Sequence, residues 1–565
     1  MKITLAQTRI FSNQIERNFS EIKDLVLKHA RDSDLIIFPD LALSGYVGKY
    51  FLDADYISEL LDYNEIIKEL SHNIAIIWSN LSLENNQITK KIYFAAKGAF
   101  LEPVSSLNLD VFSNELDGYE IIKPYQKVNI YQFLNQKLEL SYLKSSYSRN
   151  LENKPDIKII LGNQSHLLNE DQNKVSLANE TTEIYLNMVG VYNTATNIFP
   201  FSGGSYLKTK EYHYELNKNF ETEVATFDLT TFKTTNLEKP ASLYATLVST
   251  LRYFDEEVFP YQPNWIVGIS GGLDSSISLA LLVKAFGKKR VIPVTLPSRY
   301  TSDQTFQNVL QSVKALELSL KTIEIDALAD LSKTALEDSG YQNIPALVDE
   351  NIQARLRGHL LMGVAGIENG VIINNSNKIE IAIGYSTLYG DTIGAIALLG
   401  DLNKLDLINL AQEINQINQK VIIPLNLIPK ITSDELLWEV LPSAELASKQ
   451  VDPLVYGYHD SLIDFLLKKP LTELLKLYLN QKLWELPGFK AGLKHGFDDP
   501  ETFINDLKKM LRMLQIAGYK RFQMPPIITL TTTAFGLTPE NQISQHFTQE
   551  QTTLINQILE KKEKL

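Results

Sequence analysis

One stretch of the chain combines glycines, hydroxyl side chains and a carboxylate in a way that suits phosphate chemistry. An apolar run at 265–269 leads directly into Ser-Gly-Gly-Leu-Asp-Ser-Ser at 270–276. A strand that delivers two glycines and a serine to the start of a helix points bare backbone N–H groups, and the positive end of the helix dipole, at one spot. We therefore predict an anion site there, formed by Ser270, Gly271, Gly272, Ser275 and Ser276.

Asp274 adds a carboxylate to this loop. Because Mg²⁺ prefers carboxylate and phosphate oxygens, Asp274 and the flanking hydroxyls suit a magnesium-bound pyrophosphate. The loop lacks the Gly-Lys-Ser/Thr ending of the P-loop that transfers a γ-phosphate. Cleavage between the α- and β-phosphates of ATP is therefore the favoured chemistry. The structural alternative is a plain strand-to-helix turn capped by Ser and Asp.

This loop and the blocks after it resemble the N-type ATP pyrophosphatases, and among them the NAD synthetases. GMP and argininosuccinate synthetases share the loop but not the later blocks. Within the turn at 375–380, Asn375 stands where that family usually has Thr, and Ile379 where it usually has Ser. The blocks cover most of residues 240–540 in the family's order and are Glu350–Gly358, Asn375–Glu380, Tyr385–Asp391, Asp401–Lys404, Pro442–Leu446 with Gln450 and Asp452, and Lys520–Pro525.

The resemblance implies ATP-dependent amidation of nicotinic acid adenine dinucleotide to NAD. A carboxylate resists ammonia because oxide is a poor leaving group, whereas an adenylated carboxylate releases AMP readily. Such a site needs an anion cradle, a metal, and cations against the developing charge.

The resemblance also assigns roles to individual residues. Taken singly, Arg355 and Arg357 are equally compatible with surface ion pairs, and Lys404 with an ordinary exposed lysine. The implied catalytic residues are Asp274, Lys404 and Ser443, and the implied Mg²⁺ ligands are Asp274 and Glu380. The implied ATP contacts are the 270–276 cradle, Arg355, Asn375 and Lys404, and the implied dinucleotide contacts are Asn351, Arg357, Lys378, Tyr389 and Asp391.

The first half of the chain resembles a nitrilase-fold glutaminase, the domain fused to many NAD synthetases. The matching blocks are Met1–Ile10, Asp34–Tyr46, Leu186–Gly190 and Phe201–Ser205. That family works with a glutamate base, a lysine for the oxyanion and a cysteine nucleophile.

None of these three residues is found where the resemblance expects it. Asp40 stands at the glutamate position, no lysine occurs at 101–115, and Ser141 lies on the nucleophile strand of a chain with no cysteine. A serine without a strong base is a poor substitute for a thiolate. We therefore expect a degenerate glutaminase site, in which Asp40 is a cap or turn residue and the domain has a structural role.

Composition limits the remaining classes of function. A length of 565 residues predicts two or three domains, and a net charge of −13 argues against binding to nucleic acid or an anionic membrane. No uncharged apolar run approaches the roughly 20 residues that span a bilayer, and the start of the chain does not read as a signal peptide. We expect a cytoplasmic protein and, from the resemblance, a homo-oligomer.

Apolar periodicity predicts the elements that position these residues. The first half alternates strands, such as 3–10, 157–161 and 184–189, with helices such as 15–29. After a polar joint, a helix at 241–254, strand 265–269, helix 275–286 and strand 291–295 predict parallel pairing. The predicted fold class is α/β: a nitrilase-like α-β-β-α sandwich at 1–229, a linker at 230–240, and a doubly wound parallel-sheet synthetase domain at 241–565.

The leading interpretation is an ammonia-dependent NAD synthetase that uses ATP and Mg²⁺. In a second interpretation, another protein hydrolyses glutamine and hands over ammonia. A third is a nucleotide-binding regulatory pseudoenzyme, which Asn375 favours but the intact Asp274, Glu380, Lys404 and Arg355 oppose. Another carboxylate substrate, such as nicotinic acid mononucleotide, also stays open.

Overall fold

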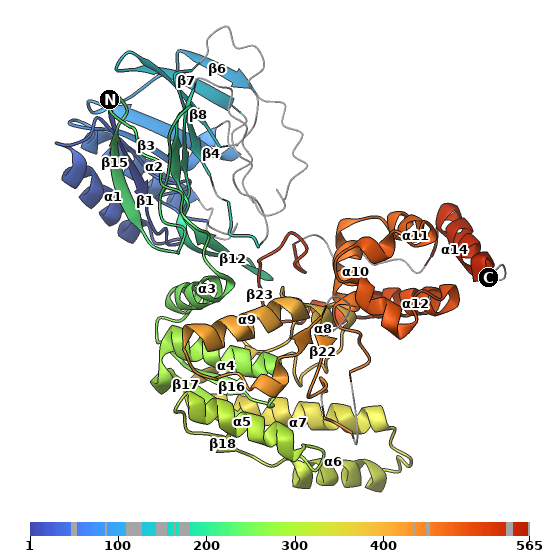
Figure 1. Cartoon of the computed structure of the whole chain (residues 1–565). Helices are drawn as coiled ribbons and strands as arrows, with labels where there is room; N and C mark the ends of the chain where they lie inside the picture. Colours follow the sequence, from blue (N-terminus) through green and yellow to red (C-terminus); the bar gives the residue numbers. More distant parts are fainter. Residues whose placement is uncertain are drawn as a thin grey trace. The chain divides into compact units, whose positions relative to one another are not determined.

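The structure is a computed structural model, shown in Figure 1, that describes residues 1–46, 54–84, 87–108, 127–142, 155–162, 164–168, 181–432, 436–443, 445–447, 452–537 and 546–562. The chain forms two compact units. Unit 1 contains Met1–Asn193 and Phe199–Tyr253, and unit 2 contains Thr194–Ile198 and Phe254–Leu565. Unit 2 thus includes a short segment from the first half of the chain.

Unit 1 is built on two facing β-sheets. Apolar side chains from alternate positions, such as Leu5 and Ile77 of one sheet and Leu140 and Ile159 of the other, fill the space between them. The first sheet has the order β15 (Glu223–Asp228), β1 (Lys2–Gln7), β2 (Leu35–Ile37), β3 (Ala75–Glu84), β4 (Gln87–Ala96), β5 (Ala99–Phe100). The second has the order β14 (His213–Glu215), β13 (Tyr206–Lys208), β10 (Thr182–Leu186), β9 (Ile157–Leu161), β8 (Gln136–Ser141), β7 (Lys127–Phe133), β6 (Ser105–Asn108).

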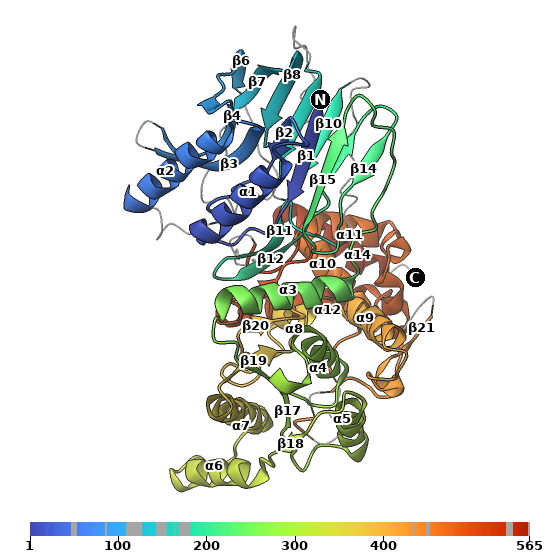
Figure 2. The same cartoon turned by 90° about the vertical axis from the view of Figure 1, so that its left-hand side faces the viewer.

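Helices α1 (Ile15–His29) and α2 (Ala54–Leu70) lie along the outer side of the first sheet, as Figure 2 shows. Helix α1 buries Ile15, Asn18, Ile22 and Val26, a spacing that places them on one face. The described residues thus supply a helix layer and two sheets of the predicted sandwich, and the α/β class is confirmed.

Two predicted elements of unit 1 differ from those observed. The predicted strand 184–189 is two strands, β10 and β11 (Val189–Asn193), because Asn187 hydrogen-bonds the backbone of Gly203 (3.0 Å) and interrupts the pairing. The predicted linker 230–240 pairs with unit 1: Asn236 N donates to the His213 carbonyl (2.9 Å), and Glu215 N donates to the Asn236 carbonyl (2.8 Å). This segment therefore runs alongside β14 before α3 (Leu243–Val258) begins.

Unit 2 is built on a parallel sheet. Trp265 faces one side and stacks on Phe286 of α4, whereas Ile266 faces the other and packs with Val364 of α7. Helices therefore cover both faces (Figure 2), as a doubly wound sheet requires. The strand order is β23 (Ile527–Ile528), β20 (Ile396–Ala397), β19 (Gly370–Asn374), β16 (Asn264–Gly268), β17 (Val291–Thr295), β18 (Lys321–Thr322), with the start of β12 (Asn197–Ser202) parallel to β23.

The helices of unit 2 form a layer on each face of this sheet and a C-terminal helical cluster. Tyr458, Phe503 and Ile558 are fully buried in the core of that cluster. Among the described residues, no helix has the length and apolarity needed to cross a membrane. The helices are α4 (Leu273–Phe286), α5 (Asp303–Ala315), α6 (Asp326–Asp338), α7 (Ala346–Ile367), α8 (Lys378–Ile383), α9 (Lys404–Ile417), α10 (Tyr458–Lys468), α11 (Leu471–Leu479), α12 (Pro500–Ile516), α13 (Gly518–Arg521) and α14 (Gln549–Lys562).

Candidate active site

The 270–276 loop connects β16 to α4 as predicted. Gly271 has φ +86°, and a Cβ there would lie 2.2 Å from the carbonyl oxygen of Thr305, so only glycine fits. Gly272 is the N-cap of α4 and supplies no side-chain acceptor for the first helical N–H groups. The hydroxyls of Ser270 and Ser275 lie 3.1 Å apart beside these amides. This geometry is compatible with the anion cradle predicted at the start of α4, which stays a prediction.

Asp274 lies in the first turn of α4 and meets a lysine from α9. Both carboxylate oxygens of Asp274 are 3.0 Å from Lys404 Nζ, and Asn377 Nδ2 donates to Asp274 Oδ2 at 2.9 Å. The Lys404 side chain is only 5% exposed. Burial alone would lower the pKa of Lys404, but Asp274 and Glu380 raise it above its ordinary value. Lys404 is therefore a charged ammonium at the mouth of the cradle and not an ordinary surface lysine.

Glu380 comes to the same place from α8. Its carboxylate accepts from Asn377 N (3.2 Å), and Asn377 Oδ1 accepts from Glu380 N, which forms a capping box. Burial and the negative charge of Asp274 raise the pKa of Glu380 above its ordinary value. A cation bound beside Glu380 would offset both causes and favour its ionised form.

The donor set fits Mg²⁺ held jointly by protein and substrate. Asp274 and Glu380 provide carboxylate oxygens, and no third ligand joins them, because the described residues contain no cluster of three or more His, Cys, Asp or Glu that could hold a metal. Mg²⁺ commonly takes one or two protein carboxylates and completes its shell with water and phosphate oxygens. The predicted pair therefore suits a metal that arrives with ATP.

A third carboxylate, Asp452, lies close to this group. Tyr456 donates to Asp452 Oδ2 at 2.8 Å, and the Lys404 ammonium lies 4.9 Å from the centre of the Tyr456 ring. Burial raises the pKa of Asp452, and the charge of Lys404 counteracts part of that rise. Sequence reasoning placed Asp452 in a family block without a role, and it did not identify Tyr456.

Helix α7 and the loop after α8 hold several predicted nucleotide contacts. Arg357 is largely buried, donates to the Leu296 carbonyl (3.0 Å) at the end of β17, and keeps Nη1 without a hydrogen-bond partner. Burial lowers the pKa of Arg357 to about 10. Arg355, by contrast, is exposed and donates to the Leu388 carbonyl. Neither arginine forms an ion pair among the described residues.

Asn351 and Asp391 meet at Thr387. Thr387 donates its hydroxyl to Asn351 Oδ1 (2.8 Å) and its N–H to Asp391 Oδ1 (2.6 Å). Burial raises the pKa of Asp391 to about 6. Asn375 donates to the Gly268 carbonyl (3.0 Å), and its buried Oδ1 has no partner. The structure thus brings these predicted residues to the ends of β16 and β19.

A cavity of about 540 Å³ lies beside Tyr389 and the first residues of β19, a size typical of small-molecule sites. It is lined by Tyr389, by Met362 of α7, by β19 and the loop 392–395, and by Gln523–Pro525. Tyr389 has φ +64° and donates its hydroxyl to Gln523 Oε1 at 3.1 Å. Sequence patterns do not reveal this cavity, because its walls come from four separate segments.

Two predicted residues are placed apart from the cradle. Ser443 accepts from Glu445 N within its own loop, and no hydrogen bond joins it to residues 270–276 in the part of the chain that the structure describes. Glu445 instead reaches the start of α5, where it accepts from Thr305 Oγ1 (2.8 Å). Lys378 is buried, with its ammonium among Asp401, Asp464, Thr531 and Thr533. The roles predicted for Ser443 and Lys378 stay predictions.

In unit 1, Asp40 is a buried ion-pair partner. Its Oδ2 lies 2.7 Å from Lys90 Nζ, its Oδ1 accepts from Ser79 Oγ at 2.7 Å, and the Asp40 and Lys90 side chains are 1% and 3% exposed. Asp40 lies in a turn as expected, but its side chain caps no helix. The lysine was missed because it lies on β4, before the 101–115 stretch, of which 109–115 lie outside the described residues.

Ser141 faces away from this group. Leu138, Leu140 and Tyr142 pack into the core between the sheets, and the Tyr142 hydroxyl lies 3.0 Å from Ser79 Oγ. The neighbours of Ser141 in register, Ile160 and Tyr185, lie on the opposite face of the sheet. Strand alternation therefore turns Ser141 away from Asp40, and the two do not form a nucleophile and base.

Comparison with known proteins places these features in a family. The NAD synthase family profile matches residues 252–483. The glutamine-dependent NAD(+) synthetase of Synechocystis is 32% identical over half of this chain, a match that spans 45% of the Synechocystis protein. The corresponding protein of Thermotoga maritima is 25% identical over 95% of this chain and 97% of its own length.

Solved structures extend the likeness in fold to the whole chain. The glutamine-dependent NAD(+) synthetase of Cytophaga hutchinsonii superposes with a TM-score of 0.75 at 14% identity, covering 99% of each chain. That of Acinetobacter baumannii, in complex with ADP, superposes with a TM-score of 0.65 at 21% identity, covering 97% of this chain and 99% of that one. Residues 252–483 therefore match the NAD synthase family model, and the whole chain has the fold of the glutamine-dependent NAD(+) synthetases of known structure.

Proposed function

We propose that the chain converts nicotinic acid adenine dinucleotide to NAD in an ATP-dependent amidation, with ammonia as the direct nitrogen donor. The observation that carries this proposal is the group at the start of α4, where Asp274, Glu380 and Lys404 meet beside an anion cradle. The match to the NAD synthase family model and relatives named as NAD(+) synthetases support the amidation.

The reaction needs two displacements. First, a carboxylate oxygen of the nicotinate attacks the α-phosphorus of ATP, which forms an acyl-adenylate and releases pyrophosphate. The 270–276 amides and Lys404 bind the departing pyrophosphate, and Asp274 and Glu380 would hold Mg²⁺, which neutralises phosphate charge when bound. Ammonia then attacks the acyl carbon, AMP leaves, and the nitrogen loses a proton to give the amide.

The dinucleotide is assigned to the cavity beside Tyr389. Asn351, Arg357 and Asp391 lie on the elements that connect this cavity to the ends of β16 and β19. Arg357 keeps a buried N–H without a protein partner, and such a group favours an acceptor atom on a ligand.

Ammonia is proposed as the donor because the residues for glutamine hydrolysis are not assembled. The chain has no cysteine, and Asp40 has both oxygens occupied by Lys90 and Ser79. The relatives are named glutamine-dependent, which favours glutamine. We give more weight to the absence of cysteine than to the names of the relatives, because glutamine hydrolysis through a thioester needs a thiolate. A partner that hydrolyses glutamine and supplies ammonia is the alternative.

We also propose a homo-oligomer. Helix α7 exposes the large apolar side chains Leu347, Met362 and Ile367, which are 66%, 57% and 85% exposed, and Phe522 is 73% exposed. Exposed apolar side chains of this size are candidates for burial in an interface. Light scattering of the purified chain tests this, and a monomer at micromolar concentration would refute it.

The function is tested with purified protein, ATP, Mg²⁺ and nicotinic acid adenine dinucleotide, with ammonium or glutamine as the nitrogen source. We expect equal amounts of NAD and AMP with ammonium and neither above background with ammonia-free glutamine. NAD from glutamine alone would refute ammonia dependence, and no AMP with either donor would favour a nucleotide-binding pseudoenzyme.

A further inference from the structure

Helix α8 carries Glu380 but is too short to hold itself in place. It has six residues, Lys378–Ile383, whereas isolated helices of fewer than about 12 residues are marginal in water. The position of Glu380 and of the preceding Asn377, which both face Asp274, therefore depends on whatever fixes the two ends of α8.

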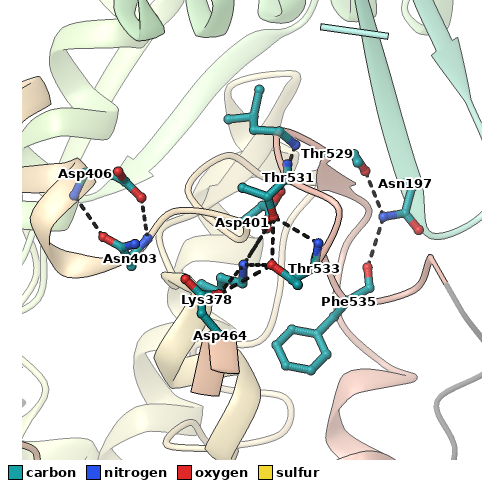
Figure 3. A network of polar contacts seen from close by, with 11 residues as sticks. Asn197, Lys378, Asp401, Asn403, Asp406, Asp464, Thr529, Thr531, Thr533 and Phe535 are labelled. Atoms are coloured by element: carbon teal, nitrogen blue, oxygen red, sulfur yellow. Dashed lines mark hydrogen bonds and ion pairs between the residues drawn. The ribbon is translucent and has the colours of Figure 1, made fainter. Parts of the chain in front are cut away.

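The first end is fixed by Lys378, as Figure 3 shows. The Lys378 ammonium lies 2.9 Å from Asp464 Oδ1 and 3.1 Å from Asp401 Oδ1, and it donates to Thr533 Oγ1 at 2.7 Å and Thr531 Oγ1 at 3.2 Å. The side chain is only 4% exposed. An ammonium has three N–H donors, so these oxygens saturate it and leave none for a substrate.

Asp401 connects this ammonium to the segment after β23. Its Oδ2 accepts from the backbone N–H groups of Leu530 and Thr531 at 2.7 and 2.6 Å, and its Oδ1 accepts from Thr531 Oγ1 at 2.8 Å. Asn197 holds the same segment from the other side by donating to Thr529 Oγ1 and the Phe535 carbonyl, as Figure 3 also shows. The segment 529–535 is therefore a rigid seat for Lys378.

The second end of α8 is fixed by two cations from α13. Lys520 Nζ donates to the carbonyls of Gly384 (2.7 Å) and Ser386 (2.5 Å), and Arg521 Nη1 donates to the carbonyl of Ala382 (2.6 Å). The last carbonyls of a helix lack partners within the helix, and cations there also favour the dipole. Residues beyond 483, where the family match ends, thus help to hold both ends of α8: Thr531 and Thr533 at the first, and Lys520 and Arg521 at the second.

We propose that Lys378 is a positioning residue and not a dinucleotide contact, and that the C-terminal segment 520–535 completes the synthetase site by holding α8 so that Asn377 and Glu380 face Asp274. The kinetic part of this proposal rests on the proposed function. The structural part, that Lys378 and its partners hold α8 in place, does not. Weakening the contacts of Lys378 should raise the Mg²⁺ concentration needed for half-maximal activity, because Glu380 is a proposed Mg²⁺ ligand. It should leave dinucleotide binding unchanged.

Thr533→Val is the informative substitution. Lys378→Met would leave the buried carboxylate of Asp401 and the partly buried carboxylate of Asp464 without their cation, and it is expected to unfold the region. Thr533→Val instead removes the contacts of one hydroxyl, which accepts from the Lys378 ammonium and also lies 3.4 Å from Asp464 Oδ1 and 3.1 Å from Thr531 Oγ1, and it keeps every charge. The matched control is Thr553→Val in α14, where an exposed threonine hydroxyl donates to the Gln549 carbonyl at 2.9 Å.

The test combines hydrogen–deuterium exchange over 376–384 with steady-state kinetics in which Mg²⁺ and the dinucleotide are varied separately. For Thr533→Val we expect about tenfold faster exchange in α8 and about tenfold more Mg²⁺ at half-saturation, the order of effect of removing a hydroxyl that hydrogen-bonds to charged groups. The KM for the dinucleotide should stay at the parent value, and Thr553→Val should change nothing.

Unchanged exchange over 376–384 in Thr533→Val, with or without a raised dinucleotide KM, would overturn the proposal. If the parent chain forms no AMP, the proposed function fails, but the exchange experiment still decides whether Lys378 and its seat position α8.

Discussion

Each unit contains a buried aspartate–lysine pair, and the two pairs have different surroundings. Asp40 and Lys90 in unit 1 are 1% and 3% exposed, and Ser79 occupies the second oxygen of Asp40. Asp274 and Lys404 in unit 2 are 16% and 5% exposed and lie beside uncapped helix amides and a second carboxylate, Glu380. A buried pair is therefore not a site by itself. What distinguishes unit 2 is a second carboxylate beside the pair and a helix start with no side-chain cap.

The largest expected effect of a substitution is that of Asp274→Ala on catalysis. Loss of the proposed metal ligand and of the partner of Lys404 should lower AMP formation about 1000-fold or more. The substitution also leaves the buried Lys404 ammonium without Asp274, so some loss of stability is expected. Circular dichroism at the assay temperature checks that the chain is still folded, and AMP release at parent rates would show that Asp274 has no part in the reaction.

Lys90→Met tests the other pair. It leaves the Asp40 carboxylate buried without its cation, which should cost about 3–5 kcal/mol of stability. Urea unfolding measures this loss, with Lys91→Met on the same strand as control. Ammonium-driven turnover of the folded fraction should stay near the parent value. A fall in turnover of more than a few-fold, measured below the unfolding transition, would contradict a purely structural role for this pair.

The motif at 270–276 was predictable because its residues are contiguous and each has a chemical reason to be there. The Asp40–Lys90 pair was not, because its members lie 50 residues apart and meet only through strand order. The seat of Lys378 was hidden for the same reason, since Asp464 and Thr533 carry no local signature. Helix α1 and strand β9 were predicted with their observed bounds because their apolar periodicity is unbroken.

The units should also differ in their response to acid. Burial lowers the pKa of His166 in unit 1 to about 4, whereas an unfolded histidine titrates near 6.5. The folded state therefore binds fewer protons, and unit 1 should lose up to about 3 kcal/mol of stability as pH falls from 6.5 to 4. Urea midpoints at pH 7 and pH 5 measure this loss. His166→Gln should flatten the dependence, and an equally steep dependence in that variant would assign it to other groups.

The smallest effect expected is that of adding one methyl group to the cradle. Gly271→Ala places a Cβ against the Thr305 carbonyl at a positive φ, so strain of about 1–3 kcal/mol should appear as weaker ATP binding. Gly287→Ala is the matched control, because its φ is +76° but nothing lies within 4 Å of the added Cβ. A higher KM for ATP in Gly271→Ala than in Gly287→Ala would indicate that the shape of the cradle matters, beyond backbone strain alone. Equal KM values would argue against the cradle.

The short segment Thr194–Ile198 limits where the chain could be divided into separately expressed halves. Its residues Asn197 and Ile198 extend the parallel sheet of unit 2, and Asn197 holds Thr529 and Phe535 in place. A gene truncated before α3 would lack the segment that pairs with β23. The backbone N–H and C=O groups at the edge of β23 would then be unpaired, and such an edge can template aggregation. The N-terminal half of the chain therefore supplies part of the framework of unit 2.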